Sequence, residues 1–392
     1  MELKQSNTTI SAEHLLQALA DGAAVHLDRC HIAGAFDLNL LFSNENPLKA
    51  EKLKVIISET SKTLVLSQPV HFNACTFEND VVFSGSWEKP ESLNVIFEED
   101  VLFNSSEFVG QTRFSCAQFK KLAGFDGCTF HRVCTFRNAV FYGLAMFRTA
   151  TFEGYGLFNG ARFRGDTRFT NTCFGKGVNF SDVKFENSCD FAGVYSRHKS
   201  VPIYDNITFA RNRFGDDASF WRFIKQVCQE AGHYQQAGEC FYAERCAYFW
   251  QRFRGCGYEK LSAVKKAARG LLMGLRLLPE FVLGRLLFGY GERPIRVLGA
   301  GAVIIILCAL FYHSDAASFA FQYGLERPQQ SDHLAFLEGL YYSTVTFTTL
   351  GFGDIYPAAD ILTRVVTMLE SLAGACLMAL FVVTLSKRFS RG

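Results

Sequence analysis

The residues best suited to chemistry lie together near the C-terminus, where the chain contains Thr348-Thr349-Leu350-Gly351-Phe352-Gly353-Asp354. Main-chain carbonyl oxygens can replace the hydration shell of a cation when several of them face one side of the backbone. Such a backbone needs dihedral angles that glycine adopts at little cost, and two glycines alternate with other residues here. The stretch is therefore a candidate for binding a dehydrated cation through its main chain.

Two apolar segments flank this stretch. Residues 295–312 are apolar apart from Arg296 near their start, and residues 361–385 form the second segment. Each reaches the roughly 18 to 20 residues that cross a bilayer as a helix. A pair of buried helices in a soluble protein is the alternative, but it explains neither the lengths nor the stretch between them. We predict two membrane spans.

A short helix is predicted over residues 334–347, directly before the cation-binding stretch. Ser331 or Asp332 is the candidate N-cap. The negative C-terminal end of this helix would face the cation. Tyr341 and Tyr342 form an aromatic pair that can brace the stretch after it.

Residues 348–354 resemble the selectivity filter of potassium channels, whose pattern is T-T-V-G-Y-G-D. Leu350 takes the place of Val, and Phe352 takes the place of Tyr and lacks its hydroxyl. The order of helix, pore helix, filter and helix is that of a two-transmembrane channel subunit. The resemblance implies a homotetramer, because four strands are needed to surround an ion, with K⁺ as the permeant ion and no cofactor.

The same resemblance assigns roles around the filter. It implies that Thr349, Leu350, Gly351, Phe352 and Gly353 form the ion-coordinating filter, with the carbonyls of residues 349–352 and the Thr349 hydroxyl as ligands. Thr348 would support the filter. Asp354 would lie at the outer mouth, where a ring of carboxylates concentrates cations. A turn residue before Tyr356-Pro357 is the alternative for Asp354.

Two residues of the second apolar segment are candidates for gating or for the ion cavity. Glu370 is the only acid well inside a span, so it should face protein or water. Its carboxylate would either attract cations in the cavity or hydrogen-bond to the pore helix near Ser343 or Thr346. Gly374 falls where inner helices of channels often carry a hinge glycine, and close packing through small residues explains it equally well.

Basic residues are distributed unevenly around the two segments. The only Lys or Arg in residues 313–360 is Arg327, whereas seven lie in residues 265–296 and three in residues 387–391. The positive-inside rule then places both termini in the cytoplasm of a multi-pass protein of the cell membrane. No charged n-region with an apolar core opens the chain, so no cleavable signal peptide is expected.

A second pattern precedes the apolar segments. Phenylalanine recurs from residue 97 to residue 191 at intervals that alternate between six and five, which gives a period of eleven. Neither an α-helix nor a regular strand has that period. Two residues before most of these phenylalanines lies a small residue, at positions 112, 117, 123, 128, 134, 139, 145, 150, 156, 161, 167, 172 and 189.

This pattern resembles the pentapeptide-repeat family, with Phe at the central position usually held by Leu and one extra residue in every second unit. The resemblance implies a right-handed parallel β-helix in which two such periods make one coil around a buried phenylalanine column. We expect this solenoid to start near Ile32 and Phe36, with strands at residues 55–57 and 64–66 and a loop at 87–90. Ser11 should cap a helix through Leu19 that covers the first coil.

Helical spacing returns after residue 206. Residues 218–231 and 234–252, separated by Gly232-His233, should form a hairpin over the last coil. Residues 271–290 carry Arg276, Glu280 and Arg285, which favours an interfacial helix on the cytoplasmic leaflet over the alternative of a third span. Residues 230–245 and 289–294 look like the segments that join repeats to channels in pentapeptide-repeat proteins.

The expected fold is therefore mixed, a β-helical solenoid joined to an α-helical pore domain. Its parts are a capping helix in residues 1–25, the solenoid in 26–210, the hairpin in 211–260, the interfacial helix in 261–293 and the channel domain in 294–392. The solenoid would regulate the channel or bind an unknown cytoplasmic protein or ligand. The alternative is a membrane-anchored scaffold whose pore module does not conduct.

Other classes of function find little support. Ten acids against thirteen Lys or Arg in residues 97–199 argue against a DNA mimic, and we expect no nucleic-acid partner. His233, Cys240 and Cys246 are not spaced like metal ligands. The remaining cysteines in this cytoplasmic region are interpreted as free thiols. We find no pattern of catalytic residues and expect no enzyme.

Overall fold

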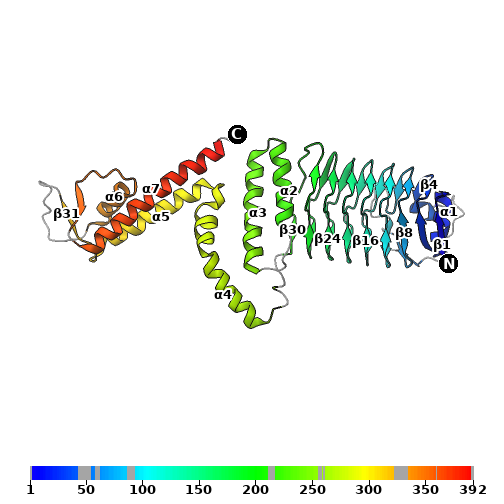
Figure 1. Cartoon of the computed structure of the whole chain (residues 1–392), viewed down its shortest axis with the longest axis horizontal. Coiled ribbons are helices and arrows are strands. Elements are labelled where there is room, and N and C mark those ends of the chain that lie inside the picture. Colours follow the sequence, from blue (N-terminus) through cyan, green and yellow to red (C-terminus); the bar gives the residue numbers. More distant parts are fainter. Residues whose placement is uncertain are drawn as a thin grey trace. The chain divides into compact units, whose positions relative to one another are not determined.

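The computed structural model describes residues 2–42, 54–57, 62–85, 93–210, 217–254, 258, 261–321, 334–358 and 360–389. The chain divides into two compact units, Met1–Gly270 and Leu271–Gly392. The first is a stack of short strands followed by helices, and the second is helical (Figure 1).

The strands of the first unit form four sheets, which we name A to D. Sheet A contains, in the order in which the strands pair, β1 (Glu2–Ser6), β3 (Ala24–Asp28), β8 (Val70–Asn73), β12 (Val101–Leu102), β16 (Ala123–Gly124), β20 (Ala145–Met146), β24 (Thr167–Arg168) and β28 (Cys189–Asp190). Sheet B contains β2 (Thr9–Ser11), β4 (His31–Ala33), β9 (Thr76–Phe77), β13 (Glu107–Phe108), β17 (Thr129–Phe130), β21 (Thr151–Phe152), β25 (Cys173–Phe174) and β29 (Tyr195–Ser196).

The two remaining sheets complete each coil. Sheet C contains β5 (Phe36–Asp37), β10 (Val81–Val82), β14 (Thr112–Arg113), β18 (Cys134–Thr135), β22 (Tyr155–Leu157) and β26 (Gly177–Asn179). Sheet D contains β6 (Lys54–Ile57), β7 (Lys62–Leu66), β11 (Leu93–Phe97), β15 (Gln118–Phe119), β19 (Val140–Phe141), β23 (Arg162–Phe163), β27 (Lys184–Phe185) and β30 (Thr208–Phe209). All neighbours pair in parallel except β6 and β7.

The predicted coil of two periods is confirmed by the strand register. Phe97 pairs with Phe119, Phe119 with Phe141, and Phe141 with Phe163. The phenylalanines of the ladder are at most 2% exposed, and the predicted small residues beside them are buried as well. Eleven residues therefore form two of the four sides of a coil, and the next eleven form the other two.

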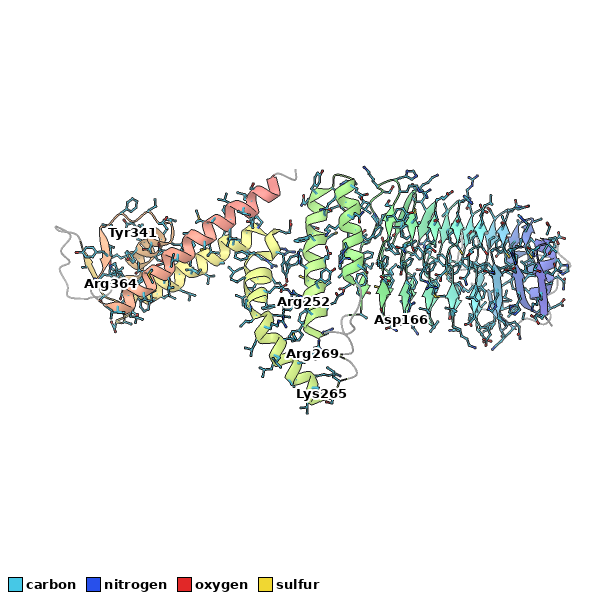
Figure 2. All side chains as sticks on the ribbon, viewed as in Figure 1. Asp166, Arg252, Lys265, Arg269, Tyr341 and Arg364 are labelled. Carbon is cyan, nitrogen blue, oxygen red and sulfur yellow. The ribbon has the colours of Figure 1, made fainter. Side chains whose placement is uncertain are left out.

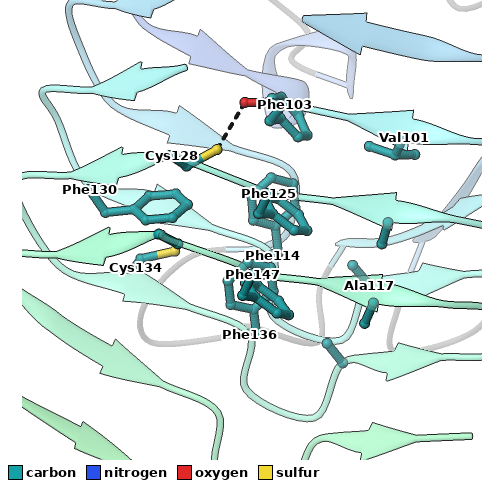
Figure 3. Close-up of a cluster of buried hydrophobic side chains, with 14 of the residues drawn as sticks. Val101, Phe103, Phe114, Ala117, Phe125, Cys128, Phe130, Cys134, Phe136 and Phe147 are labelled. Atoms are coloured by element: carbon teal, nitrogen blue, oxygen red, sulfur yellow. Dashed lines mark hydrogen bonds between the residues drawn. The ribbon is translucent and has the colours of Figure 1, made fainter. Parts of the chain in front are cut away.

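The buried phenylalanine rings form stacked columns. Phe103, Phe125 and Phe147 follow one another at centroid distances of 5.5 and 5.1 Å, with planes 12° and 6° apart. Rings of different columns meet at steep angles, as Phe114 does against Phe125 at 74°. Figure 3 shows these columns and the Cys128 thiol, which donates to the Phe103 carbonyl at 2.9 Å. Cysteine at a small inward position therefore satisfies a buried carbonyl as well as filling space.

Every eleventh residue of the ladder has left-handed backbone. These residues, with φ between 54° and 73°, are Ser105, Cys116, Gly127, Asn138, Thr149, Gly160, Asn171, Asp182 and Gly193. Each lies two residues after a ladder phenylalanine, in a turn closed by a bond such as Ser106 N–H to Phe103 O at 3.0 Å. The left-handed residue closes the five-residue steps, and the six-residue steps turn without one. This division explains how units of unequal length turn similar corners.

The N-terminal end of the stack differs from expectation. The stack begins at β1 and β2, ahead of the helix, and not at residue 26, because residues 2–6 pair in parallel with 24–28. Helix α1 (Ala12–Ala20) is the predicted one, with the Ser11 hydroxyl accepting from the His14 N–H at 3.2 Å. The predicted strands at 55–57 and 64–66 are present as an antiparallel pair, and the loop at 87–90 lies outside the described residues.

A helical hairpin closes the other end of the stack. Helices α2 (Asp217–Glu230) and α3 (Tyr234–Arg254) match the prediction, and Gly232 between them has a φ of 80°. Phe220 of α2 is fully buried, and its ring meets those of Phe180 and Phe191 at 79°. The hairpin therefore covers the end of the phenylalanine columns, as predicted.

The segment before α5 begins as a helix and ends in irregular turns. Helix α4 (Ala263–Pro279) begins within the range of 261–293 given above, over alanines and lysines that favour helix. Pro279 has no N–H to donate, and a π-helix η3 (Glu280–Leu287) and a 3-10 turn η4 (Gly289–Gly291) follow it. Residues 289–291 all have positive φ.

The helices of the pore region match the predicted order. They are α5 (Pro294–His313), α6 (Phe336–Phe347) and α7 (Ile361–Phe389), with strands β31 (Phe319–Phe321) and β32 (Ile355–Pro357) paired antiparallel. Among the described residues, the helices long and apolar enough to cross a membrane are α5 and residues 361–386 of α7. The candidate N-caps Ser331 and Asp332 lie outside the described residues, and the Glu338 carboxylate accepts from the Ala335 N–H at the start of α6 at 3.0 Å.

Replacing Thr149 by Asn should stabilise the coil stack. Thr149 is β-branched and has a φ of 54°, a conformation that costs about 1–2 kcal/mol for most residues and less for Asn. We expect Thr149→Asn to raise the free energy of unfolding by about 0.5–1 kcal/mol in chemical denaturation. Thr151 lies in strand β21, and Thr151→Asn should lower it. An equal effect of the two substitutions would contradict this explanation.

His131 provides a pH-dependent contact between coils. Its Nε2 lies 2.6 Å from Oε1 of Glu107, and its Nδ1 lies 2.7 Å from Oε2 of Glu153. Arg197 approaches Glu153 at 3.9 Å. Hydrogen bonds to Glu107 and then to Glu153 raise the pKa of His131 above its usual value of 6.5. The imidazolium therefore bridges carboxylates of neighbouring coils.

This bridge should weaken in alkaline solution. A pKa that is higher in the folded than in the unfolded chain gives stabilisation that is complete below about pH 6.5 and is lost as the pH rises through the folded value. Between pH 6 and pH 8.5 the wild-type Tm should fall more than that of His131→Gln. The exposed His198 supplies the control, since His198→Gln should leave the wild-type pH dependence intact. Parallel curves for wild type and His131→Gln would exclude this role.

Candidate functional site

The predicted cation-binding stretch has an alternating backbone. Thr349, Gly351 and Gly353 have φ values of 59°, 57° and 79°, while Leu350 and Phe352 between them are not in the left-handed region. Alternation between the left-handed region and the rest of φ/ψ space turns successive peptide units so that their carbonyls can face one side. A row of carbonyl oxygens on one side is the arrangement that replaces water around a cation.

The stretch is anchored to the end of helix α6. The N–H groups of Thr348, Thr349 and Leu350 donate to carbonyls of the last helical turn at 3.0 Å each. The Thr348 hydroxyl donates to the Thr344 carbonyl at 2.7 Å, and the Thr349 hydroxyl donates to the Thr348 carbonyl at 2.7 Å. The Thr349 oxygen keeps its acceptor lone pairs for a cation. The helix end and the stretch are thus one hydrogen-bonded unit.

Tyr341 supports the far end of the stretch. Its ring stacks on Phe352 with centroids 6.5 Å apart and planes 8° apart, and its hydroxyl donates to Oδ2 of Asp354 at 2.8 Å. Phe352 lacks a hydroxyl, so a polar link behind the stretch is made two residues later, at Asp354. Tyr342 faces the other way, with its ring 5.2 Å from that of Tyr312 on α5. Of the predicted pair, Tyr341 is therefore the one that braces the stretch.

The segment after Asp354 is held by a small sheet that the sequence did not reveal. Ile355, Tyr356 and Pro357 of β32 pair with Phe321, Ala320 and Phe319 of β31. Asp360 then accepts from the N–H and hydroxyl of Thr363 at 2.8 and 2.7 Å, at the start of α7. Both ends of the stretch are therefore anchored, by α6 before it and by β31 after it.

Gly374 lies where α7 meets the end of α6. A Cβ added to Gly374 would lie 2.0 Å from the carbonyl oxygen of Phe347, the last residue of α6. Phe347 also packs on Gly301 of α5, where an added Cβ would lie 3.0 Å from the ring. The two glycines let three helices converge on Phe347, directly before residues 348–354. This geometry supports the packing interpretation of Gly374.

Glu370 lies one turn before Gly374 and links three helices. It is 2% exposed, and its Oε2 accepts from the Tyr312 hydroxyl of α5 at 2.6 Å. Its Oε1 accepts from the hydroxyl of Ser343 on α6, and this hydroxyl also lies 2.9 Å from the carbonyl of Ile305. The hydrogen bond to Ser343 is one of the two expected from the sequence. Glu370 therefore fixes α7 against α5 and α6.

A cavity of about 540 Å³ lies beside the stretch, between α6 and α7. Tyr341 and Arg364, labelled in Figure 2, both line it, together with Phe352 and Met368. Leu350 and Phe352 are 63% and 65% exposed. Large apolar side chains beside an open cavity are typical of a surface that another chain covers.

Several contacts of the site could not be located from the sequence. Tyr312 appeared only as the end of an apolar segment, although a buried Glu370 requires donors and a tyrosine in the facing span is a candidate. No sequence pattern marked Phe347 as a contact residue, because its packing partners Gly301 and Gly374 are distant from it in the chain. No group of three or more His, Cys, Asp or Glu that could hold a metal ion occurs within the described ranges.

Comparison with known proteins agrees with this geometry. Residues 300–391 match a family model described as ion channel, and they contain most of α5, all of α6 and α7, and the stretch 348–354. No match was found among curated proteins or among solved structures. The C-terminal unit therefore contains an ion channel domain with two apolar helices, a composition that suggests a membrane location. The N-terminal unit is a β-helix-like repeat domain.

Substitution at Gly374 should show whether its role is packing. Gly374→Ala places a methyl group against the Phe347 carbonyl, so α7 must move away from α6. We expect the Tm of the detergent-solubilised protein to fall markedly, equivalent to about 2–3 kcal/mol. Gly299 on α5 has open space around it, and Gly299→Ala should leave the Tm unchanged or raise it. A Tm for Gly374→Ala equal to that of Gly299→Ala would disprove the close contact.

Proposed function

We propose that this protein is a subunit of a homotetrameric potassium-selective channel. The observation that carries the proposal is the alternating backbone of residues 349–353, next to the end of a pore helix and inside a region that matches an ion channel model. Carbonyls of residues 349–353 and the Thr349 hydroxyl would replace the water around K⁺. Several ions in single file would keep exit fast.

Fourfold assembly follows from the geometry of coordination. One strand offers oxygens on one side of the ion only, and four strands complete the cage. The exposed Leu350 and Phe352, and the cavity that Phe352 lines, support this, because neighbouring subunits would cover them. In the tetramer the Asp354 carboxylates would form a ring at the outer mouth, each oriented by Tyr341.

The orientation in the membrane follows from charge. Lys and Arg cluster before α5 and at the end of α7, so both termini would be cytoplasmic and the pore helix would enter from outside. Helix α4 would lie in the interface, since Leu271, Leu272 and Leu275 are 67–70% exposed and basic residues flank them.

Contacts made by η3 and by Phe288 after it would connect helix α4 to helix α7 and could carry regulation. Leu287 and Phe288 belong to one hydrophobic cluster with Val297 of α5 and with Leu377 and Phe381 of α7. Arg296 also donates from Nη1 to the Arg285 carbonyl at 2.9 Å. A displacement of α4 would therefore reach the cytoplasmic half of α7. In the proposal, the β-helical domain senses a partner or ligand and acts through this connection.

Ion flux from the purified protein tests the proposal. Reconstituted in liposomes, the wild type should pass K⁺ and exclude Na⁺. Gly351→Asp should abolish the flux, because a side chain at this position with φ of 57° distorts the row of carbonyls. Gly299→Ala serves as a matched control and should conduct, since no atom approaches within 4 Å of its added Cβ.

Three results would overturn parts of the proposal. Equal K⁺ and Na⁺ permeability would leave a channel without potassium selectivity. A particle that is not fourfold by mass would exclude the coordination cage. Absence of flux under varied voltage, pH and membrane tension would favour the alternative, a membrane-anchored scaffold.

A truncated protein tests the role of the solenoid. If a protein lacking residues 1–210 still forms tetramers and still conducts, the solenoid is regulatory and is not required for assembly.

A further inference from the structure

One outer face of the coil stack carries a dense group of cations. On sheet D, Lys120, Arg162, Arg164 and Lys184 are exposed, and Lys120 and Arg164 lie over the ring of Tyr142. We call these five residues the basic face. They lie directly before or after ladder phenylalanines that point inward, so their side chains point outward. Acids border this face at both ends, since Glu98 directly follows β11 beside Lys120 and Glu186 directly follows β27 beside Arg164.

The charges of the basic face are poorly neutralised. Arg162 and Lys184 are direct partners in the parallel register of β23 and β27, and like charges opposite each other destabilise a sheet. Arg164 approaches Glu186 at 3.8 Å, whereas Arg162 and Lys184 form no ion pair with any residue in the described ranges. Natural folds keep an unfavourable pairing of like charges mainly where those charges serve binding.

Tyr142 holds two of the cations in place. The Lys120 Nζ lies 3.8 Å from the centre of its ring, and the Arg164 guanidinium carbon lies 4.7 Å from it. Lys120 also donates to the Gln118 side chain at 2.9 Å. Cation–π contacts of this kind fix long side chains without neutralising their charge. The cations are thus preorganised and available to an anion.

We propose that the basic face binds an extended acidic segment of a partner protein. Arg162 lies in β23 and Arg164 directly follows that strand, so the two are two residues apart in extended chain, a spacing of about 6.6 Å. Alternate side chains of an extended peptide have nearly the same spacing, so two carboxylates at alternate positions can each meet one guanidinium. Lys184, on the next strand about 4.8 Å away, offers a charge to the same segment.

The same features disfavour other anionic partners. Proteins that bind duplex nucleic acid can make about 6–10 phosphate contacts, and this face has four cations with two acids beside them. A membrane-binding surface adds exposed apolar side chains, but no large apolar side chain is exposed among the described residues of sheet D between β15 and β27. A narrow acidic strand fits the size and the flatness of the face better.

A labelled peptide tests the proposal on the full-length protein in detergent. The probe is a fluorescent peptide of about 12 residues alternating Glu and Ser, with a Gln–Ser peptide as neutral control, measured by anisotropy at about 0.15 M salt. The wild type should bind the acidic peptide only. The double variant Arg162→Glu with Lys184→Glu should weaken binding by about tenfold or more.

A charge-matched variant separates local contact from net charge. Arg132→Glu with Lys176→Glu makes the same change of charge at exposed positions outside sheet D, and it should leave the affinity within about threefold of wild type. Far-UV circular dichroism checks that both variants fold, as expected for outward side chains.

Other outcomes would overturn the proposal. The first is an equal loss of affinity in both double variants. The second is a dissociation constant above about 1 mM for the acidic peptide and the wild type. Tighter binding of single-stranded RNA or of phosphatidylserine vesicles through Arg162 and Lys184 would assign the face to a different partner. Ion conduction is not involved, so failure here leaves the proposed channel function untouched.

Discussion

Left-handed backbone at fixed intervals is the constraint on which both units depend. In the coil stack it recurs every eleven residues and closes the five-residue corners. In the channel domain it recurs every two residues, at Thr349, Gly351 and Gly353, and reorients successive peptide units. L-residues avoid this region because Cβ approaches the following carbonyl, so each occurrence must be stabilised by its surroundings.

The surroundings differ between the two units. In the coil stack each corner hydrogen-bonds to the coils beside it, as the Thr149 N–H does to the Thr170 carbonyl at 2.9 Å, and the phenylalanine columns fix the distance between coils. In the channel domain residues 348–354 are held by α6, by Tyr341 and by the pairing of the following residues with β31. Phe347 and Glu370 in turn position α6 against the two long helices.

Polar groups in the apolar parts of both units make structural contacts. Cys128 and Thr172 donate to carbonyls inside the coil stack at 2.9 and 2.7 Å. Glu370 accepts from Tyr312 and Ser343 between the long helices. Buried polar groups without partners are costly, and each of these satisfies a group that the fold would otherwise leave unpaired. In the channel domain the Glu370 carboxylate is the buried polar group that links α5, α6 and α7.

The sequence by itself determined the elements and their order. The spacing of Phe97, Phe119 and Phe141 revealed the coil length, since a side chain must return to the same face after each turn, and the lengths of residues 295–312 and 361–385 indicated the spans. Glycine at 351 and 353 marked the stretch that needs unusual dihedrals. These features are local or strictly periodic, so they are visible without knowing which residues meet.

Only the tertiary structure decided the contacts between distant segments. The bond of Tyr312 to Glu370, the approach of Gly374 to Phe347 and the pairing of β31 with β32 all join segments that are far apart in the chain. The pairing of residues 2–6 with 24–28 was missed for the same reason. Such contacts depend on how non-repeating helices and strands pack in space, and packing of that kind, unlike the phenylalanine columns, leaves no periodic trace in the sequence.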